Sequence, residues 1–170
     1  MQGEGFCVGS RPSAQKAEMR FSRLLAQNDC SGDGFVHEFS FKGFAKWGEE
    51  EMTSNMQIAD GVSSSRVYLA KSKSDYNVNL AAIDDNSGPH RWTISRGTGD
   101  WYHIKVSPGV ADDRMFLSAT EDGTNVDLFY DDDGSGRQRW SISRGNGNFF
   151  YIKIFGGVSN ERAFLSASSD

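Results

Sequence analysis

The sequence RVYLA at residues 66–70 returns as RMFLS at 114–118 and as RAFLS at 162–166, a step of 48 residues each time. A second motif repeats with the same step, because HRWTISRG at 90–97 matches QRWSISRG at 138–145. Self-similarity at a fixed period of this length is typical of proteins built from repeated supersecondary units. The chain of 170 residues therefore holds two complete units and fragments of a third.

Apolar residues alternate with other residues inside each unit, as at Val78 and Leu80 or at Trp92 and Ile94. A period of two predicts β-strands with one buried face, and places the tryptophans in the core. Clusters of Gly, Ser, Asp and Asn between these stretches predict tight turns. The expected strands lie near 66–70, 77–82, 90–95 and 101–106 in the first unit, and near 114–118, 125–130, 138–143 and 149–154 in the second.

The repeated motifs resemble those of β-trefoil proteins. The strand sequences YLA and FLSA are similar to the first strand of ricin-type and fascin-like trefoil units, and Gln138-Arg139-Trp140 matches the Gln-x-Trp motif of the ricin type. His90 departs from that motif at its first position. The resemblance implies an all-β fold, with residues 51–170 forming a β-trefoil of four-strand units.

The segment before the repeats is similar to an EF-hand. Residues 13–27 contain no Val, Ile or Thr and are rich in helix formers, which predicts a helix. The loop that follows carries Asp29, Ser31 and Asp33 at the spacing of calcium ligands. Ser40 stands where the family places a bidentate glutamate, so the resemblance implies a weak Ca²⁺ site at most.

A second interpretation of residues 1–50 is a degenerate first trefoil unit, because residues 24–32 also line up with residues 80–88. The two interpretations lead to different organisations of the chain. In the first, an EF-hand-like helical segment over residues 1–50 precedes the trefoil; in the second, that segment supplies the trefoil's missing hairpin. A further possibility is an oligomer in which another chain supplies that hairpin.

Composition narrows the classes of partner. The 18 basic and 23 acidic residues give a net charge of −5, which disfavours nucleic acid. No stretch approaches the ~18–20 apolar residues of a membrane span. No secretory leader is visible, and two cysteines do not form a disulfide framework, so we expect a cytoplasmic protein. The scattered histidines and the lack of nucleophile or phosphate-loop motifs predict no enzymatic activity.

The candidate binding residues are acidic and aromatic. The pattern Asp-Asp-x-Ser-Gly occurs at 84–88 and 132–136, where the carboxylates either accept hydrogen bonds from a ligand or satisfy local backbone N–H groups in turns. A tyrosine beside three consecutive aspartates is placed to stack on a sugar ring. The candidate ligand-binding residues are Tyr130, Asp131, Asp132, Asp133, Asp84 and Asp85.

These observations favour a non-catalytic, lectin-like module that binds carbohydrate and has no cofactor, apart from the weak calcium site. The first alternative is an intracellular, fascin-like protein-interaction or structural module that binds a protein partner in an assembly or on the cytoskeleton. The second alternative is a weakly calcium-responsive binding protein, which depends on Asp29, Ser31 and Asp33.

Overall fold

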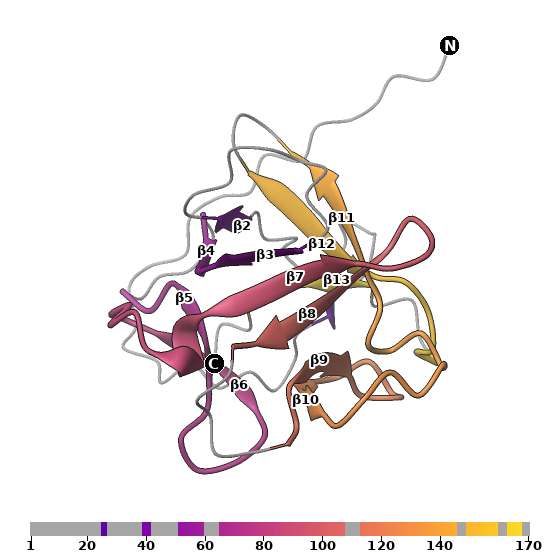
Figure 1. Cartoon of the computed structure of the whole chain (residues 1–170), viewed down its shortest axis with the longest axis horizontal. Coiled ribbons are helices and arrows are strands. Elements are labelled where there is room, and N and C mark those ends of the chain that lie inside the picture. The colour runs from indigo at the N-terminus through magenta and orange to yellow at the C-terminus, as the bar shows by residue number, and fades with distance from the viewer. Residues whose placement is uncertain are drawn as a thin grey trace.

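Antiparallel β-sheet makes up nearly all of the regular structure (Figure 1). The computed structural model describes residues 25–26, 39–41, 51–59, 65–107, 113–145, 149–159 and 163–167. Within these ranges there is no α-helix, and the one helical turn is a short 3-10 segment, η1 (Gly88–His90). The all-β class expected from the alternating pattern is therefore confirmed.

The two repeats form the expected eight strands. The first repeat contains β5 (Tyr68–Lys71), β6 (Val78–Ala81), β7 (Trp92–Arg96) and β8 (Tyr102–Val106). The second contains β9 (Phe116–Ala119), β10 (Val126–Phe129), β11 (Trp140–Arg144) and β12 (Phe150–Ile154). Each strand overlaps the range predicted for it, and in β6, β7, β8, β10 and β12 buried and more exposed positions alternate, a pattern that is local information.

Shorter strands outside the repeats complete the sheet. They are β1 (Leu25–Ala26), β2 (Phe39–Phe41), β3 (Glu51–Ser54), β4 (Met56–Ile58) and β13 (Phe164–Leu165). The main path of neighbouring strands runs β10-β9-β8-β11-β12-β2-β4-β5-β6. Off this path, β3 pairs with β7, β7 with β8, and β13 with both β1 and β12.

The β-trefoil implied by the resemblance to ricin-type and fascin-like repeats was wrong. All thirteen described strands are linked into one open antiparallel sheet, whose main path ends at β10 and β6. Only two complete four-strand units are present among the described residues, and the third match to the repeat, at 162–166, contributes only the two-residue strand β13. Two repeats do not by themselves determine how the remaining short strands pair.

The expected N-terminal helix was also wrong where the structure describes it. Leu25 and Ala26 form strand β1, in antiparallel register with Leu165 and Phe164. Pairing with another strand satisfies backbone groups that a helix would have satisfied locally, so tertiary context overrides helix propensity at these two residues. The EF-hand-like helical segment is therefore unsupported.

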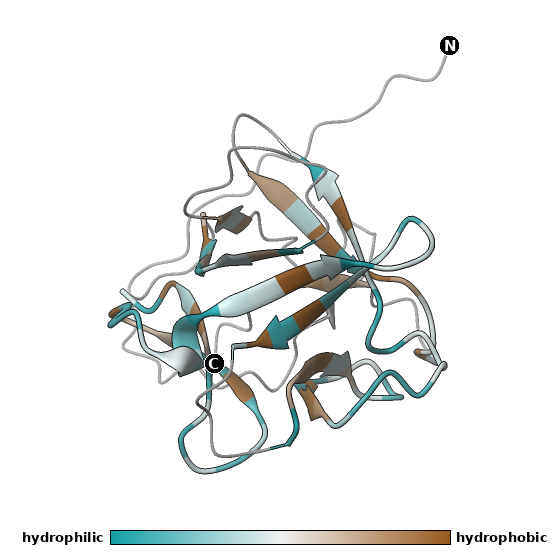
Figure 2. Ribbon diagram, viewed as in Figure 1, coloured by the Kyte–Doolittle hydropathy of each residue, from teal (hydrophilic) through white to brown (hydrophobic). Residues whose placement is uncertain are grey.

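The core is built from the inward-facing residues of the strands. Figure 2 shows apolar and polar residues alternating along β7 and β8. Trp92 and Trp140 are fully buried, as the alternation predicted. Each indole Nε1–H donates to a main-chain carbonyl 2.9 Å away, Trp92 to Leu69 and Trp140 to Leu117. The buried rings therefore bring no unsatisfied N–H group into the core.

Candidate functional site

The motif Asp-Asp-x-Ser-Gly forms a tight turn in the first repeat. The carboxylates of Asp84 and Asp85 each accept a hydrogen bond from a main-chain N–H two residues on, at Asn86 and Ser87, both at 2.9 Å. Asn86 has a positive φ of 58°, which asparagine tolerates better than most residues. His90 closes the turn, because its Nδ1 lies 2.7 Å from Oδ1 of Asp85.

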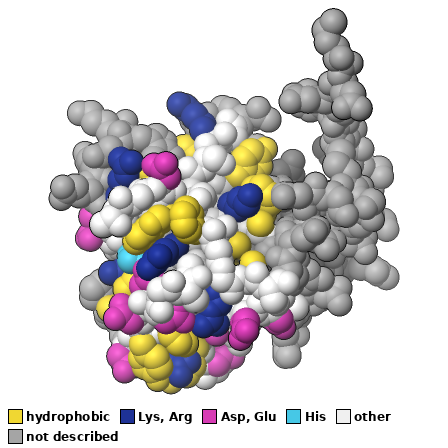
Figure 3. Space-filling model, turned by 90° about the vertical axis from the view of Figure 1, so that its right-hand side faces the viewer, with side chains coloured by type: hydrophobic (Ala, Val, Ile, Leu, Met, Phe, Trp, Pro, Cys, Tyr) yellow, Lys and Arg dark blue, Asp and Glu magenta, His cyan; other side chains and the backbone are white. Residues whose placement is uncertain are grey.

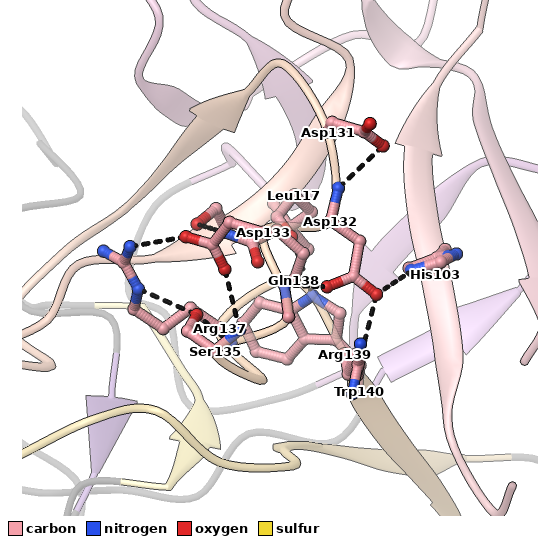
Figure 4. Close-up of polar contacts among 12 residues, drawn as sticks. His103, Leu117, Asp131, Asp132, Asp133, Ser135, Arg137, Gln138, Arg139 and Trp140 are labelled. Carbon is pink, nitrogen blue, oxygen red and sulfur yellow. Dashed lines mark hydrogen bonds and ion pairs between the residues drawn. The ribbon is translucent and has the colours of Figure 1, made fainter.

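The second repeat builds its turn in the same way (Figure 4). Oδ1 of Asp132 accepts from the main-chain N–H of Gly134 at 3.0 Å, and Oδ1 of Asp133 from that of Ser135 at 2.9 Å. Arg137 adds an ion pair, with 2.8 Å between its Nη2 and Oδ2 of Asp133. Such local side-chain to main-chain bonds are the usual reason for Asp and Ser in turns.

Asp132 also connects its turn to a neighbouring strand. Its Oδ2 accepts from Nε2 of His103 on β8 at 3.0 Å and from Nε of Arg139 at 2.7 Å, and Figure 4 shows all three side chains converging. The guanidinium of Arg139 in turn lies over the ring of Trp101, 4.9 Å from its centre. Asp132 therefore holds two hairpins together through one carboxylate.

Asp84 has the equivalent position in the first repeat. Its partner is Asn55, a buried residue between β3 and β4, whose Nδ2 donates to Oδ2 of Asp84. The other side of the same amide, Oδ1, accepts from Nη1 of Arg91 at 2.9 Å. Asn55, Asp84 and Arg91 thus stand 48 residues before His103, Asp132 and Arg139, but Arg91 donates to Asn55 and not to the aspartate.

These contacts keep the turn carboxylates ionised. Burial opposes ionisation of Asp132, but the hydrogen bonds from Arg139 and His103 outweigh it and lower its pKa to about 2. The hydroxyl and the main-chain N–H of Ser87 likewise lower the pKa of Asp85 to about 2. The hydrogen-bonding capacity of both groups is therefore already engaged within the fold.

The structure places the predicted acidic residues in two separate turns. Asp131 belongs to the second turn and is exposed, and its Oδ1 accepts from the main-chain N–H of Asp132 at 2.8 Å. In the first turn, Asp84, Asp85 and His90 bring three potential metal-ligand atoms within 4.8 Å of one another. Those atoms take part in the hydrogen bonds that close the turn.

Tyr130, the predicted aromatic platform, lies at the end of β10 and is 47% exposed. The guanidinium carbon of Arg114 is 4.3 Å from the centre of its ring and 4.0 Å from the centre of the Tyr76 ring. Tyr76 comes from the turn between β5 and β6 and is 41% exposed. An arginine between two rings gains attraction from both of their faces. We call Tyr76, Arg114, Asp127 and Tyr130 the tyrosine–arginine cluster.

Asp127 supplies a half-buried negative charge to this cluster from β10. Burial raises its pKa, while the positive charges of Arg114 and Arg137 act in the opposite direction. A hydrogen bond with the Tyr130 side chain raises the pKa of Arg114, and the charge of Asp127 adds to that effect. Arg114 is thus a permanent cation next to a carboxylate whose charge is costly to bury.

Two asparagines border the cluster. Asn77 and Asp127 face each other in an antiparallel bridge, and Nδ2 of Asn125 donates to Oδ1 of Asn77 at 3.0 Å. The Oδ1 atom of Asn125 is buried and has no hydrogen-bond partner within the described ranges. A buried acceptor is costly to leave unpaired, so this atom favours a donor from water or from a ligand.

Sequence reasoning identified Tyr130 but missed its partners. Arg114 belongs to a motif that recurs in every unit, so it looked like part of the scaffold. Both tyrosines, however, depart from the repeat, since the position of Tyr76 is Thr124 in the other unit and that of Tyr130 is Ala82. An aromatic residue at a position where the other repeat has a small residue was the signal in the sequence that could have identified this cluster.

The predicted calcium ligands Asp29, Ser31 and Asp33 lie outside the described residues. None of the helical structure in the described part of the chain is long and apolar enough to cross a bilayer, in agreement with the absence of an apolar run in the sequence. Comparison of the sequence with protein-family models and with curated proteins finds no match.

Proposed function

We propose that this protein is a non-catalytic carbohydrate-binding module and that the tyrosine–arginine cluster is its binding site. One observation carries the proposal. Two half-exposed tyrosine rings from different hairpins flank the Arg114 guanidinium beside the half-buried carboxylate of Asp127. Exposed rings beside placed polar groups are the combination that small-ligand sites use.

The chemistry of the cluster suits a sugar ring. The C–H face of a pyranose is apolar and packs against an aromatic ring, while its hydroxyls need donors and acceptors at the rim. Arg114 supplies N–H donors, and Asp127 supplies carboxylate oxygens. Tyr76 and Tyr130 supply the apolar surface.

The carboxylates favour binding over hydrolysis. A glycoside-cleaving pair needs one carboxylic acid whose pKa is raised close to a second, ionised carboxylate. The turn carboxylates with lowered pKa values are Asp75, Asp85, Asp122, Asp132 and Asp133. Asp127 has a raised pKa, but the charges that act on it are those of Arg114 and Arg137. Among the described carboxylates with shifted pKa values, this combination does not supply the acid and base roles of a glycosidase.

A glycan array followed by titration calorimetry tests the proposal. Tyr130→Ala and Tyr76→Ala should each weaken binding of an array hit by about tenfold, because each removes one stacking surface. Phe155→Ala is the matched control, since it removes an aromatic ring that is also about half exposed but lies outside the cluster. It should bind as the wild type does.

The same experiment separates this proposal from a protein-interaction module. That alternative draws support from Ile83 and Phe155, which are 73% and 52% exposed. If no glycan binds at millimolar concentration, the carbohydrate proposal is wrong. A protein partner that is lost in Ile83→Asp and retained in Tyr130→Ala would support the alternative instead.

A further inference from the structure

We propose that the tyrosine–arginine cluster accepts uncharged sugars and rejects glycans that carry a carboxylate or a sulfate, with Asp127 as the residue that sets this selectivity. The inference rests on the proposed function and names the class of sugar. It follows from how the positive charges around the two tyrosines are already compensated.

Arg114 is the cation nearest to a ligand stacked on either tyrosine, yet it is poorly placed to bind an anion. Its guanidinium carbon lies 4.0 Å from the centre of the Tyr76 ring and 4.3 Å from that of the Tyr130 ring, so the two rings shield it from an incoming ligand. The negative charge of Asp127 already interacts favourably with the positive charge of Arg114. An anionic ligand would therefore bring a second negative charge beside a half-buried carboxylate, which is unfavourable.

Two of the neighbouring basic side chains are compensated as well. Arg137 is ion-paired with Asp133, at 2.8 Å between Nη2 and Oδ2. A hydrogen bond from Ser72 lowers the pKa of Asp75, the residue before Tyr76, and the charge of Lys71 acts in the same direction with a smaller effect. Arg137 and Lys71 therefore offer little free positive charge to an acidic glycan, and Lys73, exposed in the turn that carries Tyr76, is the exception.

Exposed negative charge lies beside both tyrosines. Asp75 precedes Tyr76 and Asp131 follows Tyr130, and both aspartates are exposed. On the face drawn in Figure 3, acidic side chains lie around the hydrophobic group at its lower edge, and basic side chains are spread across the same face. Exposed charges act at a range of about 10 Å at moderate salt, so they add to the repulsion of an incoming anion.

The test compares neutral oligosaccharides with their uronic-acid, sialylated and sulfated counterparts on one array, followed by titration of matched pairs. We expect each acidic counterpart to bind at least about tenfold more weakly than its neutral parent. In Asp127→Asn, which keeps the size and an acceptor but removes the charge, this ratio should fall at least about threefold.

Asp122→Asn is the matched control, because it removes the same charge from the same β9–β10 hairpin but at its turn, away from the cluster. Its neutral-to-acidic ratio should match that of the wild type. Asp131→Asn is a second test variant. The Asp131 side chain is exposed, so its replacement should keep the fold intact, and it should lower the neutral-to-acidic ratio by less than Asp127→Asn does.

The outcomes separate the two proposals. Equal or tighter binding of acidic glycans overturns the selectivity and leaves carbohydrate binding standing. Rejection of acidic glycans that is unchanged in both Asp127→Asn and Asp131→Asn overturns the assigned role of the carboxylates. A failure of every glycan to bind overturns the proposed function itself, and the selectivity with it.

Discussion

The Nε2 atom of His103 lies 3.0 Å from Oδ2 of Asp132, and this contact ties the second Asp-Asp-x-Ser-Gly turn to strand β8. Forty-eight positions earlier, the Nδ2 atom of Asn55 donates to Asp84 in the same way. An imidazole and a carboxamide therefore serve as interchangeable donors to the first aspartate of the repeated turn. What the two units share is the hydrogen bond rather than the residue that makes it.

His103→Asn should be tolerated, because asparagine already fills this position in the first unit. We expect it to lower the free energy of unfolding by less than about 1 kcal/mol, whereas His103→Leu should lower it by about 2 kcal/mol, since a nearly buried carboxylate then loses a donor. Urea unfolding at neutral pH measures both values. Equal costs for the two variants would show that the donor does not matter.

Acid should destabilise the fold through Asp132. Its pKa is about 2 in the folded protein and about 3.9 in an unfolded chain, so the folded state binds fewer protons between these values. The stabilisation is therefore complete above about pH 5 and is lost as the pH falls towards 2. Asp132→Asn should be less stable than the wild type at neutral pH but should lose less stability between pH 5 and 2. Urea unfolding across this range tests it, and parallel curves would contradict the assignment.

Strand positions could be predicted from the sequence, because they depend on the local alternation of apolar and polar residues. Val126 and Leu128 both point inward, and the same period of two marks β6, β7, β8 and β12, whereas β9 is buried throughout. The pairing of the other strands depends on contacts far apart in sequence, such as that between Leu25 and Leu165. No local pattern encodes such a contact, which is why both the helix and the trefoil were predicted in error.

The candidate site could be predicted from the sequence only in part, for a similar reason. Tyr130 stands out locally because it lies beside three aspartates. Its relationship to Tyr76 depends on two hairpins meeting, where the main-chain N–H of Leu128 donates to the Tyr76 carbonyl at 2.8 Å. Arg114 enters the cluster only once that meeting is known. A sequence shows which residues are unusual, but not which of them become neighbours.

The two buried tryptophans should contribute equally to stability. Trp92→Phe and Trp140→Phe each remove an indole N–H and leave a buried carbonyl, of Leu69 or of Leu117, without its donor. We expect each variant to lose about 2–4 kcal/mol, from the unpaired carbonyl and from the smaller ring together. The two costs should differ by less than about 1 kcal/mol. Urea unfolding followed by circular dichroism measures them, and a variant close to wild-type stability would refute the equivalence.

Two glycines with almost the same backbone conformation provide a separate test of the packing around the second turn. Gly134 has a φ of +80° and Gly157 a φ of +78°, so alanine at either position is forced into the left-handed region. That strain costs about 1–2 kcal/mol in each variant. Any difference between them must then come from what the added methyl group contacts.

The surroundings of the two glycines differ sharply. A methyl group at Gly134 meets nothing within 4 Å, whereas at Gly157 it would lie 2.5 Å from the main-chain oxygen of Ser135 and 2.7 Å from Cγ of Arg137. Gly157→Ala should therefore cost at least about 1 kcal/mol more than Gly134→Ala. Its strain must displace the turn, so the Ser135 N–H, which donates to Asp133, should exchange with solvent faster in Gly157→Ala than in Gly134→Ala. Urea unfolding and amide hydrogen exchange measure the two effects, and equal costs with equal exchange would mean that Gly157 does not pack against Ser135 and Arg137 as described.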